Sequence, residues 1–204
     1  MSPVTHLLTG WLLTFPNKPN LLTRREKALV VAASLIPDVD GLGLLPELLT
    51  RNSSHALPWF SQYHHSLHTL AFATFCTILA FLIVGPLDGS RNRPLHSGLT
   101  TVLVFVSFHM HLLCDLIGAR GPDGYQWPIP YLKPFSNALQ LSWQGQWALN
   151  GWQNIVFTGL LLMTTLWMAW KHATSPLELF SMPANHAFVQ ALRRRFPMEP
   201  GTLA

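Results

Sequence analysis

Charged residues are scarce in this chain of 204 residues: they make up 11% of it, whereas soluble domains carry about 25%. Together with a hydrophobic content of 49%, this argues against a disordered, a collagen-like or an ordinary water-soluble protein. The formal net charge is +4, but the basic residues are not clustered with aromatic ones. We therefore expect no nucleic-acid partner.

Cysteines are few, and the first apolar residues do not resemble a signal peptide. The two cysteines, Cys76 and Cys114, lie in apolar segments, and no CxxC motif is present, so the sequence does not predict a disulfide. No basic residue precedes the apolar residues 3–15, which is not typical of a signal peptide. We expect a short helix that is retained.

Long hydrophobic runs without charge are what the sequence does contain. Three of them, residues 70–87, 99–114 and 154–170, approach the length of about 20 residues that a helix needs to cross a bilayer. They are apolar around the whole helix, and residues 3–15 and 28–45 are weaker candidates. The predicted fold is an all-α, polytopic membrane bundle with four to five segments, of which the first is short.

The basic residues predict an orientation through the positive-inside rule. If five segments cross, Arg51, Arg120 and Lys133 lie on one face, and the other ten of the 13 basic residues lie on the opposite face. The C-terminal tail is then cytoplasmic, and the loops 46–66 and 118–152 face the periplasm. The ten are Lys18, Arg24, Arg25, Lys27, Arg91, Arg93, Lys171, Arg193, Arg194 and Arg195.

The more polar C-terminal part is expected to differ from the rest. We divide the chain into a membrane-embedded domain, residues 1–170, and a basic cytoplasmic tail, residues 171–204. Within the tail, residues 181–196 could form a short amphipathic helix that ends in three arginines and lies near anionic lipid.

Ionisable residues inside the apolar segments indicate function, because such groups are costly at membrane depth. Asp38 and Asp40 follow Pro37, which breaks a helix, so both carboxylates could point into one cavity from an unwound end. One interpretation is a cation site, and the other is a helix-ending turn with Gly41.

Histidines form a second cluster. His64 and His68 are four residues apart and share a helix face, whereas His65 and His68 are three apart and nearly do so. This spacing allows two imidazoles to bind one metal ion. The alternative is a group of hydrated histidines at the membrane boundary.

A histidine and a carboxylate, His111 and Asp115, lie four residues apart on one face of the fourth segment. Asp115 could ligate a metal or orient a ligand imidazole, or the two could form a buried hydrogen bond between helices. His109 faces away from this side. In the predicted topology, these two residues converge with the two other clusters and His6 on one membrane face. Residues 118–153 form a loop on this face, which is either a lid over the cluster or an interfacial loop anchored by tryptophans.

The motifs resemble those of the bacterial inner-membrane proteins known as predicted membrane-bound metal-dependent hydrolases, over residues 3–154. Lys133-Pro134-Phe135-Ser136 is similar to the family's Trp-Pro-Phe-Ser element, with Lys133 in place of tryptophan. The histidine cluster departs from the family form, which has Arg and Gly between two histidines. The matching elements are Thr5-His6-x3-Gly10, Pro37-Asp38-Val39-Asp40, residues 64–68 and His111-x3-Asp115.

More remotely, the set is similar to the zinc-dependent phospholipase C and nuclease fold, although the later His-x3-Glu ligands of that fold have no counterpart. The resemblance and the location imply hydrolysis of a lipid or lipid-linked ester by a metal-activated water, with Asp40 and His68 catalytic and Asp40 as the general base. Zn²⁺ suits the mixed donors best. A non-catalytic metal carrier, and polar pairs that only pack helices, remain alternatives. The expected metal ligands are His6, Asp38, Asp40, His64, His68, His111 and Asp115.

Overall fold

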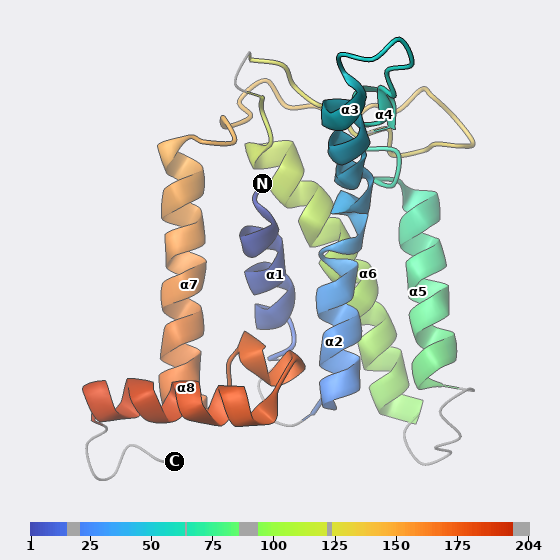
Figure 1. Ribbon diagram of the computed structural model, residues 1–204. Helices are drawn as coiled ribbons and strands as arrows, with labels where there is room; N and C mark the ends of the chain where they lie inside the picture. The colour runs from blue at the N-terminus through green and yellow to red at the C-terminus, as the bar shows by residue number, and fades with distance from the viewer. Residues whose placement is uncertain (16–20, 64, 86–93, 122–123, 198–204) are drawn as a thin grey trace.

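The computed structural model describes residues 1–15, 21–63, 65–85, 94–121 and 124–197. This part of the chain is helical and contains isolated β-bridges but no β-strand, which confirms the predicted all-α class (Figure 1). The elements are α1 (Pro3–Leu12), α2 (Arg24–Ala33), η1 (Ile36–Gly43), α3 (Leu44–Thr50), α4 (Trp59–Tyr63), α5 (Leu70–Val84), α6 (Pro94–Gly118), α7 (Trp152–His172), η3 (Pro176–Leu179) and α8 (Met182–Arg195).

The long helix α6 runs through the middle of the bundle and contacts α1, α2 and α5 (Figure 1). One buried apolar cluster joins α2, α5 and α6 through Val30, Ala80 and Val104. A second cluster, around Phe108 and Leu112, joins α5 and α6 to the loop that follows α6. The helix α6 therefore positions the residues of the other elements relative to one another.

Membrane-spanning capacity is clearest for α6. By length and composition, Ser97–Gly118 is the one helix of the described part that could cross a membrane by itself. The segments Arg24–Ala33 and Ile36–Thr50 pass the same criterion only as a pair bent by 48°, and Leu70–Val84 is apolar but shorter. The predicted helices are present, whereas their number of crossings, four to five, stays a prediction.

The break between α2 and η1 follows from Pro37. This residue has no N–H, and the N–H of Asp38 donates to the carbonyl oxygen of Leu35 at 3.2 Å in a 3₁₀ pattern. The carbonyl oxygen of Ser34, at the C-terminal cap of α2, is therefore left for another donor. The break also turns Asp38 and Asp40 out of the α-helical register, as the sequence predicts.

Small residues allow α1 to approach α2 and α6 closely. A Cβ atom on Gly10 would lie 2.2 Å from Oγ of Ser34 and 3.3 Å from Oγ of Ser107. The hydroxyl of Ser107 donates to the carbonyl oxygen of Val30 at 2.8 Å and so joins α6 to α2. Small side chains are typical of contacts between membrane helices, and this one brings His6 of α1 next to α6.

At the end of the bundle away from the loop between α6 and α7, α8 lies across the C-terminal end of α7 (Figure 1). Its bounds confirm the helix predicted at 181–196. The preceding turn η3 is held by Glu178, whose Oε1 accepts from Nζ of Lys27 at 2.8 Å and from the indole N–H of Trp11 at 3.3 Å. Arg24 also donates to the carbonyl oxygens of Leu179 and Phe180.

Candidate metal centre

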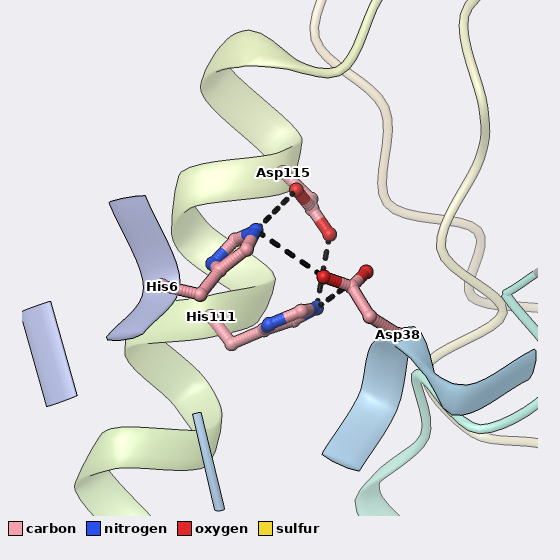
Figure 2. Close-up of side chains that lie close together, drawn as sticks. All are labelled: His6, Asp38, His111 and Asp115. Carbon is pink, nitrogen blue, oxygen red and sulfur yellow. Dashed lines mark ion pairs between the residues drawn. The ribbon is translucent and has the colours of Figure 1, made fainter. Parts of the chain in front are cut away.

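Four side chains from three elements meet at the end of the bundle away from α8. They are His6 of α1, Asp38 of η1, and His111 and Asp115 of α6 (Figure 2). Nε2 of His6 lies 3.2 Å from Oδ1 of Asp115, and Nε2 of His111 lies 3.0 Å from Oδ2 of the same carboxylate. Asp38 is 3.9 Å from His6 and 3.7 Å from His111. Its side chain is 27% exposed, whereas the other three are buried.

A second group shares Asp115 and consists of His65, His68 and that carboxylate. Nε2 of His68 is 3.3 Å from Oδ2 of Asp115 and 3.1 Å from Nε2 of His111. In each of the two groups, one ligand atom per residue lies within 4.8 Å of all the others. Oδ1 of Asp115 therefore faces His6, whereas Oδ2 faces His111 of the first group and His68 of the second.

The orientation of His111 is fixed by the backbone of α2. Nδ1 of His111 lies 2.9 Å from the carbonyl oxygen of Ser34. Because a carbonyl only accepts, Nδ1 carries the proton and donates, and in the neutral ring the lone pair of Nε2 faces Asp115 and His68. A ligand histidine typically has its second nitrogen bonded to a carbonyl or carboxylate in this way.

His6 provides a direct test of whether a cation fits. Its ring is buried, and neither ring nitrogen makes a hydrogen bond to the described residues, although Nε2 faces two carboxylates. The amino group of Met1 also contacts Asp115. Buried polar groups usually have partners, and a bound cation would supply one for His6. The imidazole nitrogens and carboxylate oxygens match the donors preferred by Zn²⁺, with Mn²⁺ and Fe²⁺ as alternatives.

Asp40 lies behind His68 rather than in either ligand group. Its Oδ2 is 3.5 Å from Nδ1 of His68 and accepts the N–H of Leu67 at 3.1 Å. A carboxylate on the far nitrogen of an imidazole orients the ring and increases its basicity. The arrangement therefore favours a positioning role for Asp40 toward His68, whereas the ligand and base roles expected from the sequence stay predictions.

The predicted convergence of the four motifs at one end is present in the structure. His6, Asp38, His68, His111 and Asp115 come together as expected, and His65, the alternative to His64, lies in the second group. The predicted ligand His64 lies outside the described residues. As expected, His109 is not part of the cluster: its Nε2 bonds to the hydroxyl of Tyr131 at 2.9 Å.

Residues of the loop between α6 and α7 cover the cluster. Trp127 contacts the rings of His65 and Phe60, with centroids 5.9 Å and 5.5 Å away. The side-chain amide of Gln146 donates to the carbonyl oxygen of Asp115 at 2.8 Å. The sequence does not predict the contacts of Ser34 and Gln146 with the cluster. Ser34 acts through its backbone, which carries no residue-specific signal.

The chain is similar to a known protein family over most of its length. The model of the YdjM inner membrane protein family matches residues 1–193. The chain belongs to this family. No curated protein and no solved structure is significantly similar to it. As a YdjM-family member the protein is an integral protein of the inner membrane, which agrees with the composition and explains why so many large apolar side chains of α5 and α7 are exposed.

Proposed function

We propose that this YdjM-family protein is a metal-dependent hydrolase that binds a divalent cation, Zn²⁺ in the first place, and cleaves an ester or phosphoester of a membrane lipid or a lipid-linked compound. The observation that carries the proposal is the meeting of His6, Asp38, His68, His111 and Asp115 around a common centre. Ionisable groups are costly in an apolar chain of this kind. Five of them from four separate segments suggest a shared ligand.

The residues around the centre have distinct roles in the proposal. When bound, the divalent cation would lower the pKa of a coordinated water toward about 7 and polarise the scissile ester. His6, Asp38, His68, His111 and Asp115 would hold the cation, and Ser34 fixes the ring of His111. Asp40 and His68 form an adjacent carboxylate–imidazole pair. Asp40 accepts the proton of the attacking water and becomes neutral, and in its charged form it orients the ring of His68 through Nδ1.

The arrangement favours a hydrolase over a metal carrier. A carrier should have polar ligands along the depth of the membrane, whereas the two described ligand groups share Asp115, close to the C-terminal end of α6. A site at one membrane face meets the headgroup region, where the ester and phosphoester bonds of lipids lie. The lipid substrate follows from this location.

Metal analysis of the purified protein is the first experiment. We expect the wild type to retain about one or two zinc ions per chain after dialysis, and Asp115→Asn and His111→Gln to lose them, because each removes a donor of the buried cluster. His109→Ala is the matched control, since His109 lies on the same helix but bonds to Tyr131. Helix content measured by circular dichroism separates metal loss from unfolding.

Activity is tested next in proteoliposomes of bacterial phospholipids loaded with the protein. We expect lipid products, detected by mass spectrometry, from wild type and His109→Ala but not from Asp115→Asn or Asp40→Asn. If the protein instead binds zinc, transports it across the vesicle membrane and yields no lipid product, its function is that of a metal carrier. A folded wild type without metal would leave the His–Asp contacts as helix-packing pairs and refute both functions.

A further inference from the structure

A cavity of about 320 Å³ opens beside the metal centre, between η1, the start of α3 and α4. Asp40 contributes the charged group of its lining, and the same carboxylate is 3.5 Å from Nδ1 of His68. The remaining wall is mostly apolar, as is typical of pockets for organic ligands, in which a few polar groups fix the orientation. The lining residues are Val39, Asp40, Leu42, Gly43, Pro46 and Trp59.

The wall of this cavity depends on a close contact between η1 and α4. A Cβ atom on Gly43 would lie 3.1 Å from the backbone of both Trp59 and Phe60. Glu47 adds a second connection, because its carboxylate accepts hydrogen bonds from the backbone and hydroxyl of Ser61. The pocket is therefore built by specific contacts of the chain.

Large apolar side chains continue outward from the cavity. Leu42 and Leu45 are 61% and 60% exposed, and Leu48, Leu49 and Trp59 are exposed as well. Adjacent exposed leucines are unusual on a surface that meets only water and typically indicate a membrane or ligand contact. They extend the apolar surface from the pocket into the surroundings of an inner-membrane protein.

We propose that this cavity binds the hydrocarbon chain of an amphiphilic substrate and thereby places the bond to be cleaved at the His–Asp centre. The inference rests on the proposed hydrolase function and names its substrate class as an acyl-chain lipid. Two observations select this occupant: the apolar wall continues into the exposed leucines, and its carboxylate contacts His68. A substrate with one polar and one apolar part matches both.

A second cavity provides a comparison. It measures about 340 Å³ and lies between the beginning of α5 and the loop after α6, next to Leu70, Leu132 and Phe135. Its lining contains hydroxyl and apolar side chains and none of the metal-centre residues. A lipid chain bound in this second cavity would therefore not lie next to a carboxylate or an imidazole of the lining.

The test is photo-crosslinking in phosphatidylethanolamine–phosphatidylglycerol vesicles that contain phosphatidylglycerol with a diazirine at the end of one acyl chain. Adducts are located by peptide mass spectrometry. We expect residues 39–59 to be labelled more strongly than the exposed face of α7, which provides the level of bulk lipid contact. Leu42→Asp should reduce labelling of residues 39–59 by about tenfold or more, because an ionised carboxylate opposes an apolar ligand.

Leu45→Asp is the matched control, because Leu45 is equally exposed and lies outside the cavity lining. It should keep the labelling within about twofold of wild type, since the changed side chain lies outside the cavity that holds the acyl chain. Equal losses in the two variants, or labelling of 39–59 no stronger than that of α7, would overturn the inference. Both positions are exposed, so neither substitution disturbs a packed core.

The variant His111→Ala separates this inference from the proposed function. We expect it to lose metal and hydrolysis but to keep the labelling of residues 39–59, because the chain is held by the cavity wall. Labelling by a wild type that binds no metal would support the lipid site and refute the hydrolase. Hydrolysis without labelling of 39–59 would support the hydrolase and refute this site.

Discussion

Nδ1 of His111 donates a hydrogen bond of 2.9 Å to the carbonyl oxygen of Ser34, and this contact connects the break in α2 to the metal centre. The carbonyl is available because Pro37 has no N–H and the N–H of Asp38 bonds to Leu35. The same proline therefore turns Asp38 toward the cluster and leaves an acceptor that orients His111. One residue organises two of the candidate ligands.

Replacing Pro37 tests this connection. In Pro37→Ala, α2 can continue as an α-helix, in which the N–H of Asp38 bonds to the carbonyl oxygen of Ser34 and competes with His111 for it. We expect zinc affinity to fall by about 10- to 100-fold, as for the loss of other groups that orient metal ligands. Competition with a chromogenic zinc chelator measures the affinity. Pro183→Ala, at the start of α8, is the control and should bind zinc as the wild type does.

Gly10 should tolerate no larger side chain. In Gly10→Ala the new Cβ would lie 2.2 Å from Oγ of Ser34, so α1 must move away from α2 and α6. We expect destabilisation by about 1–3 kcal/mol, the usual cost of overpacking, and weaker zinc binding because His6 moves with α1. Unfolding in mixed detergent micelles measures the first effect and chelator competition the second.

Two variants examine the cause of the Gly10→Ala effect. Gly159→Ala is the control, because a Cβ there meets no atom within 4 Å of the described structure. The double variant Gly10→Ala/Ser34→Gly removes the clashing hydroxyl and should recover part of the lost stability, since contacting residues couple. Equal effects at positions 10 and 159 would contradict a steric explanation.

The sequence predicts the helices and the convergence of the motifs better than it predicts the contacts within the site. Hydrophobic runs and Pro37 are local signals, so the helix ends and the break lie close to their predicted places. The bond between His111 and Ser34 has no such signal, because every residue carries a carbonyl. His65 has a left-handed backbone conformation, with φ at 71°. Helical spacing does not predict where such a residue places its side chain. The pairing of Lys27 with Glu178 joins residues 151 positions apart.

Asp40 should act on metal binding through His68. Asp40→Asn keeps an acceptor for the N–H of Leu67 but removes the charge that faces Nδ1 of His68. We expect zinc affinity to fall by about 10- to 100-fold, together with lipid hydrolysis. If zinc affinity stays unchanged and hydrolysis is lost, Asp40 acts as the general base alone. Glu47→Gln, which changes a carboxylate bonded to Ser61 at the same end, should bind zinc normally.

The ion pair between Lys27 and Glu178 should stabilise the opposite end of the bundle without affecting the metal centre. Both side chains are largely buried, at 9% and 11% exposure, and Oε1 of Glu178 also accepts from Trp11. Glu178→Gln leaves the ammonium of Lys27 buried without its counter-charge, which typically costs about 3–5 kcal/mol. We expect a lower unfolding midpoint in detergent at an unchanged zinc content.

The double variant Lys27→Met/Glu178→Leu distinguishes the loss of a partner from the loss of attraction. Replacing a whole buried ion pair by apolar residues is often neutral or stabilising, because the desolvation of two charges is avoided. We therefore expect the double variant to unfold at a higher midpoint than Glu178→Gln. A double variant as unstable as the single one would show that packing around Trp11 is what holds η3 to α1 and α2. Lys171→Met, at an exposed lysine on α7, should unfold like the wild type.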